Sequence, residues 1–163
     1  MMDQITVVRE IRIDGPGDGA WIMTRADGVF TDGYDHSFAS LRDGRIVGGF
    51  ALCAYTGAAA TVHMAGDDER WCSPDLLWLV FDYAFNQLGL NKLIATVRSN
   101  NYPALAQDIR AGWFPEAILR DVYRDAHMLL LTMKRDQCRW LKIKPKRWMT
   151  GEQARQLEMC DGR

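Results

Sequence analysis

The chain has 163 residues, of which 48% are apolar and 25% charged, and a formal net charge of −1, as is typical of one soluble globular domain with a substantial core. No apolar run approaches the roughly 18 residues that a membrane-spanning helix needs, so we expect no membrane partner. The N-terminal segment MMDQITVVREIRIDG lacks a basic start followed by an apolar core. We therefore expect no secretory signal and a cytoplasmic protein.

The four cysteines, Cys53, Cys72, Cys138 and Cys160, are scattered along the chain. They form no CxxC pair, and no histidines stand near them at the spacing of metal ligands. We therefore expect free thiols and no bound metal.

The first part of the chain predicts a strand, a short helix and an antiparallel meander. Residues 5–13 alternate apolar and charged side chains, which suits an edge or half-buried strand. After the break GPGDG, residues 20–26 favour a short helix, and a turn-rich stretch with two Asp-Gly steps follows. A further Asp-Gly step, Asp43-Gly44, is a strong hairpin signal. The strands of the meander are expected at residues 37–41, 45–55 and 58–65.

A long helix is predicted over residues 74–88. Ser73 can cap the first-turn amides, Pro74 fits the first helical position, and Asp75 complements the positive end of the helix dipole. Gly89 provides an equally clear stop. The side of this helix that should face the core carries Leu77, Val80, Phe81, Ala84 and Leu88.

Three strands and one helix are predicted after this helix. A short buried strand is expected over residues 93–97, and the loop SNNYP opens a helix that closes before Gly112. Two more strands are expected over residues 117–123 and 127–133, joined by Arg124 and Asp125.

The C-terminal segment has a different composition. Residues 134–147 carry seven basic side chains against one acidic one, and Pro145 argues against a helix there. Thr150 opens a capping box, so a short amphipathic helix is predicted to run to Met159. We therefore divide the chain into a domain over residues 1–141 and a basic tail over residues 142–163.

The order and spacing of these elements resemble the core of the GNAT superfamily of N-acetyltransferases. The matching positions are Leu76-Leu77, Tyr83-Ala84, Leu88-Gly89, Asn101, Ala104 and Gly112-Trp113. The segment GWFPEAILR is similar to the GFxxEGxLR segment of the RimJ/RimL-like branch, which acetylates protein amino groups. Residues 133–140 resemble the M-x-R-x-E-x-W ending of that branch, so the resemblance covers roughly residues 38–141.

The resemblance implies the GNAT (acyl-CoA N-acyltransferase) fold, an α/β fold in which a mixed, mostly antiparallel sheet carries helices on both faces. It also implies transfer of acetyl from acetyl-CoA to a primary amine by direct attack on the thioester. The acceptor would be a protein N-terminus, a lysine or a small-molecule amine. Acetyl-CoA would be the co-substrate, without a metal, and the protein would be a monomer or a homodimer.

The resemblance also implies residues for binding coenzyme A. In GNAT folds the pantetheine arm pairs with the fourth strand, here at Met64 and Ala65, and Asn101 matches the asparagine that binds this arm. Asn101 can also cap the next helix, and we expect both roles. The pyrophosphate lies on backbone amides before the long helix, which places it at Arg70, Trp71, Cys72 and Ser73. The glycines of that family motif are absent here, and Asp67, Asp68 and Glu69 add negative charge nearby.

His63 and Glu116 are the candidates for catalysis. His63 shares a face of the fourth strand with Thr61 and Ala65, and histidine, with a reference pKa of about 6.5, could deprotonate an ammonium. The alternative is a core histidine satisfied by the backbone. Glu116 matches the glutamate of the GFxxE segment and could contact substrate, or pair with Arg120 or a helix-end amide. The tyrosine that protonates the departing thiolate in many GNAT enzymes is replaced by Asp108, which leaves Ser99, Tyr102 and Tyr123 as candidates.

Two other readings remain open. A GNAT fold that has lost catalysis could serve as a binding module for protein or nucleic acid, with the basic tail as an electrostatic contact and Trp140 and Trp148 as stacking groups. No nucleic-acid recognition fold accompanies that tail, so nucleic acid is not the expected partner. An acyltransferase that uses another acyl group is the second alternative.

Overall fold

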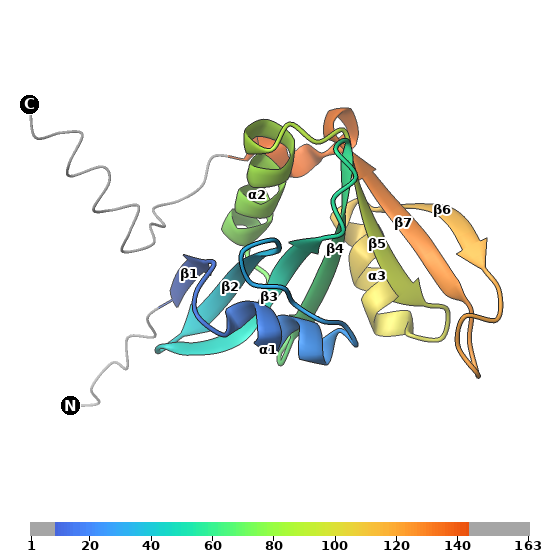
Figure 1. The fold of residues 1–163 in the computed structure, drawn as a ribbon, viewed down its shortest axis with the longest axis horizontal. Helices are drawn as coiled ribbons and strands as arrows, with labels where there is room; N and C mark the ends of the chain where they lie inside the picture. Colours follow the sequence, from blue (N-terminus) through green and yellow to red (C-terminus); the bar gives the residue numbers. More distant parts are fainter. Residues whose placement is uncertain (1–8, 144–163) are drawn as a thin grey trace, which may run out of the picture. The chain divides into compact units, whose positions relative to one another are not determined.

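The structure is a computed structural model that describes residues 9–143. In this part of the chain seven strands form one hydrogen-bonded sheet in the order β1-β2-β3-β4-β5-β7-β6 (Figure 1). The pairs β1–β2, β5–β7 and β6–β7 are antiparallel, whereas β4–β5 is parallel. The mixed sheet predicted from the sequence is thus confirmed.

The chain divides into two compact units, which we describe separately. In the described part, the first unit comprises residues 9–51 and Met64–Leu77. It contains β1 (Arg9–Ile13), α1 (Asp18–Arg25), β2 (His36–Arg42) and the larger part of β3 (Arg45–Cys53). The predicted helix and hairpin are confirmed, and the part of the predicted first strand that precedes Arg9 lies outside the described residues.

The hairpin of the first unit turns at the predicted Asp-Gly step. Asp43 and Gly44 have φ angles of 50° and 76°, both in the left-handed region. Such angles at both central residues define a two-residue turn whose twist matches that of the strands, which is why this dipeptide fixes the register of β2 and β3.

Trp71 anchors the core of the first unit. The side chain is only 5% exposed, and its ring lies 5.2 Å from that of Phe50 between centroids. A Cβ atom at Gly48 would come within 2.5 Å of the indole, and one at Gly66 within 2.0 Å. Both positions therefore require glycine, because any side chain would displace the ring.

The second unit comprises Leu52–His63 and Trp78–Ile143. The strand β4 (Ala59–Gly66) begins in this unit and pairs with β5 (Lys92–Arg98), which in turn pairs with β7 (Met128–Lys134). The edge strand β6 (Phe114–Leu119) pairs with β7 alone.

The position of β6 differs from the prediction of a strand over residues 117–123. The ladder ends at Leu119, paired with Met128, and the chain then turns at Asp121, whose φ angle is 56°. The amide of Asp121 donates to Nδ1 of His127, which closes the turn at 3.2 Å. Val122 and Tyr123 follow soon after Leu119 in the sequence, so residue types alone do not reveal where the pairing stops.

The long predicted helix is confirmed in extent, with one change near its end. It consists of α2 (Pro74–Asp82) followed by a π-helical turn over Tyr83–Gln87. A π turn places one more residue in the turn and rotates the following side chains relative to an α-helix. Phe85 is therefore fully buried, whereas Leu88, predicted to face the core, is 38% exposed. Gly89 ends the helix with a φ angle of 67°.

The last α-helix of the described chain, α3 (Tyr102–Ala111), ends at Gly112 with a φ angle of 97°. Two short 3-10 helices, Arg135–Gln137 and Arg139–Lys142, follow β7. The indole N–H of Trp140 donates to the carbonyl of Ala111 at 2.7 Å and fixes this segment to the end of α3. The predicted helix near Thr150 and most of the basic tail lie outside the described residues.

No helix within residues 9–143 combines the length and the hydropathy needed to cross a bilayer. Cys53, Cys72 and Cys138 are not in disulfides, as predicted, while Cys160 lies outside the described part of the chain. Residues 9–143 also contain no group of three or more His, Cys, Asp or Glu side chains placed to hold a metal ion.

Candidate functional site

The N-terminus of α2 is the first feature of the candidate site, and it lies in the first unit. Ser73 caps the helix as predicted: its Oγ accepts a hydrogen bond from the amide of Leu76 at 3.2 Å, and its carbonyl accepts from Leu77 at 3.1 Å. Pro74 occupies the first helical position, where no amide donor is needed. The positive end of the helix dipole therefore lies at Ser73, where an anion would be stabilised.

The four residues predicted to hold the pyrophosphate contribute differently to this helix start. Arg70 is exposed, Cys72 and Ser73 are half-buried, and Trp71 is buried in the core. Because the indole of Trp71 fills the space beside Gly48 and Gly66, only the backbone of this residue can face a ligand. Arg70 is the side chain of the four that carries positive charge into solvent.

Asp68 places a negative charge of the protein itself in this loop. Its Oδ1 accepts a hydrogen bond from the backbone amide of Arg70 at 2.8 Å, and its Oδ2 accepts one from the guanidinium of Arg42 at 2.7 Å. The hydrogen bond from Arg42, followed by that from the Arg70 amide, lowers the pKa of Asp68 and keeps it ionised. A phosphate group bound here would compete with this carboxylate for the same donors.

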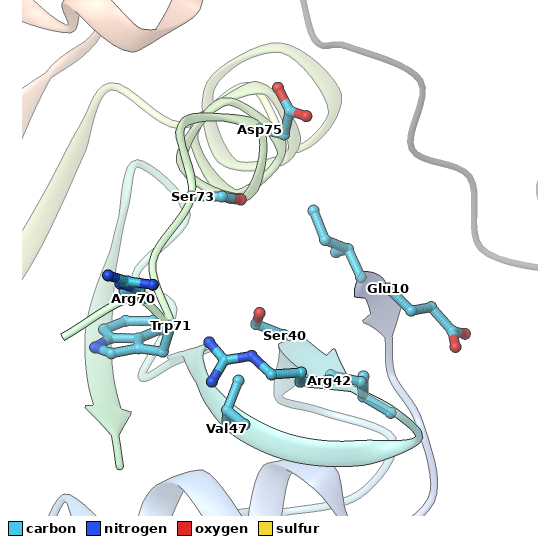
Figure 2. A pocket seen from close by; sticks show the side chains of 10 residues that line it. Glu10, Ser40, Arg42, Val47, Arg70, Trp71, Ser73 and Asp75 are labelled. Carbon is cyan, nitrogen blue, oxygen red and sulfur yellow. The ribbon is translucent and has the colours of Figure 1, made fainter. Parts of the chain in front are cut away.

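A pocket of about 190 Å³ lies beside the same loop, within the first unit. Figure 2 shows Arg42 and Ser40 entering it from β2, opposite Arg70 and Ser73 on the segment that leads into α2. Two arginines, two hydroxyl groups and a helix N-terminus therefore surround one cavity, which also has Glu10 and Asp75 in its wall. This combination favours an anionic group bound close to the arginines.

Strand β4 carries three of the predicted site residues. Ala60 and Val62 are buried while Thr61 and His63 are half-buried, which confirms that alternate residues share a face. Met64 and Ala65 are also half-buried.

The backbone of β4 loses its β5 partner partway along the strand. The parallel pairing covers Ala59–Val62 against Lys92–Ala95, whereas β4 continues to Gly66 and β5 to Arg98. From His63 onward the backbone groups of β4 on that side are therefore outside the β5 ladder. A strand edge of this kind can pair with an extended ligand.

In the second unit, Asn101 caps α3: its Oδ1 accepts from the amide of Ala104 at 3.4 Å. The cap predicted from the sequence is thus confirmed. Asn101 is exposed.

Asp108 is the residue of α3 that is buried most deeply, with 2% of its surface exposed. Burial disfavours a charged carboxylate and raises the pKa of Asp108 from 3.8 to about 7. Near neutral pH this side chain is therefore partly protonated and can donate a proton. The sequence indicated only that tyrosine is missing from this position, because burial cannot be read from the residue type.

Glu116 lies on the exposed edge strand and forms an ion pair with Lys92, with Nζ and Oε2 2.7 Å apart. Hydrogen bonds from Lys92 and Thr132 lower the pKa of Glu116, which makes it a weaker base. β5 and β7 separate β6 from β4, so Glu116 and His63 lie on strands three places apart in the sheet. The structure therefore does not bring the two predicted catalytic residues together.

The three remaining candidates for thiolate protonation have the following environments. Ser99 Oγ accepts from the amide of His127 at 3.0 Å, and Tyr102 is 71% exposed. The guanidinium of Arg98 lies 4.1 Å from the ring centroid of Tyr123, a cation–π contact.

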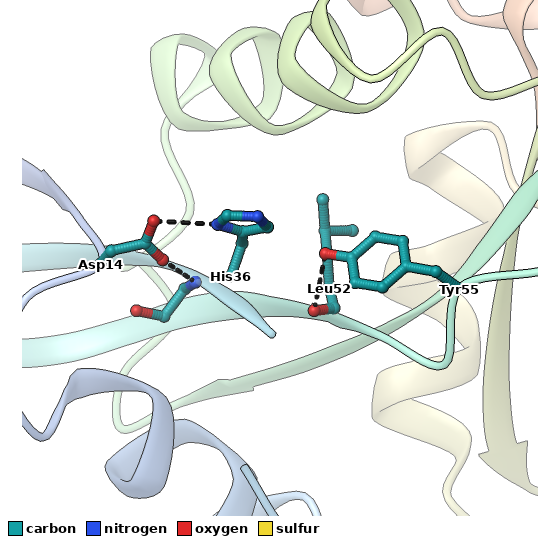
Figure 3. A network of polar contacts seen from close by, with 5 residues as sticks. Asp14, His36, Leu52 and Tyr55 are labelled. Carbon is teal, nitrogen blue, oxygen red and sulfur yellow. Dashed lines mark hydrogen bonds and ion pairs between the residues drawn. The ribbon is translucent and has the colours of Figure 1, made fainter. Parts of the chain in front are cut away.

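Sequence analysis did not identify a polar pair in the first unit, Asp14 and His36. Figure 3 shows the imidazole Nδ1 facing a carboxylate oxygen of Asp14 at 2.9 Å. The other oxygen of Asp14 accepts from the amide of Ser37, also at 2.9 Å. The two residues are 22 positions apart, and the register of β1 and β2 brings them together. No local sequence motif therefore predicts the pair. The same figure shows a separate contact of the second unit, in which the hydroxyl of Tyr55 donates to the carbonyl of Leu52 at 3.1 Å.

Comparison with known proteins gives structural relatives without sequence relatives. No protein-family model matches the chain, and no curated protein matches it in sequence. Among solved structures, mutant forms of the spermidine/spermine N-acetyltransferase SpeG from Vibrio cholerae match with a TM-score of 0.64 at 15% identity, over 79% of this chain and 96% of that one. Spermidine N-acetyltransferase from Vibrio cholerae in complex with CoA and spermine matches with a TM-score of 0.63 at 15% identity, over the same shares. The chain therefore has the GNAT fold.

Proposed function

We propose that the chain is an N-acetyltransferase of the RimJ/RimL-like branch that transfers acetyl from acetyl-CoA to a primary amine. The observation that carries this proposal is the end of β4. Its backbone leaves the β5 ladder after Val62, and the strand continues to Gly66, one short loop before the capped start of α2. An unpaired strand edge followed by a helix N-terminus suits a ligand with an amide-rich arm and a pyrophosphate.

The residues at the end of β4 and before α2 fit coenzyme A, although the carboxylate of Asp68 competes for one of the amide donors. Met64 and Ala65 would pair with the pantetheine arm. The family resemblance, by sequence position alone, implies Asn101 as a further donor or acceptor for it. The pyrophosphate would be held by the backbone of residues 70–73 and the charge of Arg70. The amide of Arg70 already donates to Asp68, so a bound pyrophosphate must displace this carboxylate. This displacement makes the net free energy of coenzyme binding less favourable. When bound, acetyl-CoA supplies an activated acetyl group as a thioester.

The chain must supply proton transfers and positioning for this reaction. The acceptor must lose a proton before its nitrogen can attack, and His63, half-buried on β4, is the proposed base. Backbone amides of β4 would donate to the developing oxyanion. The candidates for protonating the departing thiolate are Ser99, Tyr102 and Tyr123, because Asp108, at the position of the family's tyrosine, has only 2% of its surface exposed. Glu116, held ionised by Lys92, is assigned to substrate contact.

The acceptor is an amine in this proposal, and aliphatic amines are the first class to test. The solved structures with the same fold include acetyltransferases for spermidine and spermine. The segment 112–120, which resembles the RimJ/RimL-like branch, supports protein amino groups as a second class. Trp113, in that segment, is 3% exposed and lies 6.0 Å from Phe81 between ring centroids, so the motif also has a packing role.

A pair of variants at Ser73 tests the proposal. Both Ser73→Asp and Ser73→Asn keep a good helix cap, but only the first adds a negative charge at the helix start. We expect Ser73→Asp to weaken acetyl-CoA binding in calorimetry by about tenfold or more, and Ser73→Asn to change it little. Thiol release from acetyl-CoA in the presence of an amine should follow the same order. Equal affinity of the two variants would remove the helix start from the coenzyme site.

The rival proposal is a binding module that has lost catalysis. It rests on the missing glycines before α2 and on Asp68, which occupies donors that a phosphate would use. In that case acetyl-CoA should not bind saturably, and no amine should release its thiol. For the acetyltransferase we also propose a cytoplasmic location and a monomeric or homodimeric state. An acyltransferase that uses another acyl donor is a further alternative.

The proposed domain ends at residue 141, where Trp140 is anchored on α3. Deleting the tail, residues 142–163, should therefore leave coenzyme affinity unchanged. A loss of affinity in a chain that still folds would assign the tail to the site.

A further inference from the structure

The sheet of the second unit has one buried face and one partly accessible face. The buried face carries Leu93, Ala95, Val97, Leu131 and Met133. Side chains alternate between the two faces of a strand, so the residues between these point to the other side. That side, which we call the open face, carries the half-buried residues Ile94, Thr96, Met128 and Leu130.

The strand register extends the open face from β4 to β6 (Figure 1). Thr61 on β4 pairs with Ile94, Ile94 with Thr132, and Thr132 with Phe114. These four residues form one row across four neighbouring strands. Because adjacent strands lie about 4.8 Å apart, the row is about 14 Å long.

The outer end of the open face is apolar and exposed. Phe114 is 62% exposed and Leu119 is 45% exposed, and both belong to β6. The register pairs Leu119 with Met128, so it lies on the same side of the sheet as Phe114. With Ile94 and Leu130 these side chains make an apolar surface that solvent reaches in part, and such surfaces mark binding sites for ligands or partners.

The proposed base belongs to the same face. His63 follows Thr61 by two residues on β4, so both side chains point to the open face. His63 is half-buried, as Ile94 is. An amine that reaches His63 from this side would have the rest of its atoms over Ile94 and Leu130, in the direction of Phe114.

The carboxylates that contact this face are already paired. Nζ of Lys92 lies 2.7 Å from a carboxylate oxygen of Glu116, and a guanidinium nitrogen of Arg98 lies 3.6 Å from Asp125. Lys134 pairs with Lys92 in the register and adds a further positive charge at the end of β7. A second ammonium group of the acceptor would therefore lose hydration here without gaining an unpaired carboxylate.

We propose that the acceptor is a small primary monoamine with an apolar alkyl or aromatic chain, and that the open face holds this chain. The inference rests on the proposed acetyl transfer with His63 as base. Full burial of a methylene group changes affinity about fourfold, so a surface that covers one side of the chain should change it about twofold per methylene.

A series of amines tests the chain. Thiol release from acetyl-CoA by the full chain is measured with 1-aminobutane, 1-aminohexane and 1-aminooctane, and KM should fall about twofold per added methylene. The matched probe 1,8-diaminooctane has the same length and a second charge, and its KM should be about tenfold higher than that of 1-aminooctane. A KM that does not depend on chain length, or a diamine that equals the monoamine, would overturn the proposal.

Phe114 and Ile118 provide a matched pair of variants. Both side chains are 62% exposed on β6, but Phe114 pairs with Thr132 and Ile118 with Leu129, so they lie on opposite faces. Phe114→Ser should raise KM for 1-aminooctane about three- to tenfold and leave KM for acetyl-CoA unchanged. KM for 1-aminobutane, which is too short to reach Phe114, should stay the same, and Ile118→Ser should change none of these values. Equal effects of the two variants would overturn the open face as the binding surface.

Binding measurements separate this inference from the proposed function. Thiol release that does not respond to Phe114→Ser would overturn the open face and leave the acetyltransferase intact. Calorimetry with 1-aminooctane covers the opposite case: binding that Phe114→Ser weakens and Ile118→Ser does not, without thiol release, would overturn the acetyltransferase and the acceptor role. Transfer only to peptides with apolar N-terminal residues would overturn the small-molecule acceptor.

Discussion

Replacing Asp108 by asparagine should make the protein more stable above neutral pH and leave it nearly unchanged in acid. Asparagine has the shape of the protonated carboxyl group but never ionises. Asp108 is 2% exposed and its pKa is raised by burial from 3.8 to about 7, so the folded protein holds the neutral form. The variant therefore removes the cost of ionising a buried carboxyl and little else.

The size and sign of the effect follow from the shift in pKa. Between pH 4 and pH 7 the folded state binds more protons at Asp108 than the unfolded state does, so stability falls as the pH rises through this window. Below pH 4 the full contribution of the neutral Asp108 carboxyl to stability is present, and above pH 7 this contribution is lost. A shift of about three units at 1.36 kcal/mol each corresponds to roughly 4 kcal/mol. At pH 8 we expect the free energy of unfolding of Asp108→Asn to exceed that of the natural chain by about 2–4 kcal/mol. The range extends below about 4 kcal/mol because relaxation around the charge reduces the cost of ionising the buried carboxyl.

Urea unfolding at several pH values between 4 and 8 measures this difference. The control is Asp136→Asn, which removes an exposed carboxylate and should shift stability by less than about 0.5 kcal/mol at every pH. A difference between Asp108→Asn and the natural chain that stays constant from pH 4 to 8 would refute the reasoning, since it would mean that Asp108 ionises normally.

Three further predictions concern the core and the site. Phe81→Ala, at a side chain that is 1% exposed, should lower the free energy of unfolding by about 3–5 kcal/mol in urea, and a loss under about 0.5 kcal/mol would place this helix face in water. Asp68→Asn should tighten acetyl-CoA binding several-fold in calorimetry, because Arg42 and the amide of Arg70 lose an internal anion; weaker binding would show that Asp68 shapes the loop for the ligand. His63→Ala should slow acetyl transfer about 10²-fold without changing acetyl-CoA affinity, and unaltered turnover would assign the proton to another acceptor.

Local signals in the sequence were sufficient for most elements. The Asp-Gly step at residues 43 and 44 fixed a hairpin, because left-handed φ angles at both positions are required there. Ser73 and Pro74 marked the start of α2, and Gly89 and Gly112 marked the ends of two helices. Each of these signals depends on the conformation of one to four neighbouring residues. They can therefore be read without knowing what packs against them.

Element boundaries that depend on partners were predicted less well. The end of β6 is set by its pairing with β7, and the strand-favouring residues Val122 and Tyr123 follow after it. The burial of Phe85 and the exposure of Leu88 depend on a π-helical turn, which shifts the phase of the helix. Sequence periodicity assumes a regular helix and cannot show such a change.

The sequence by itself determined the element order and the helix caps, and it indicated candidate residues for a coenzyme site. Only the tertiary structure decided how these residues are used. Asp68 binds Arg42 across 26 residues, Asp14 meets His36 across 22, and Asp108 is buried although its neighbour Ile109 is 44% exposed. Charge pairing, desolvation and pocket lining all depend on which distant segments lie together. The order of residue types does not by itself show which distant segments meet, because the folded sheet brings them together.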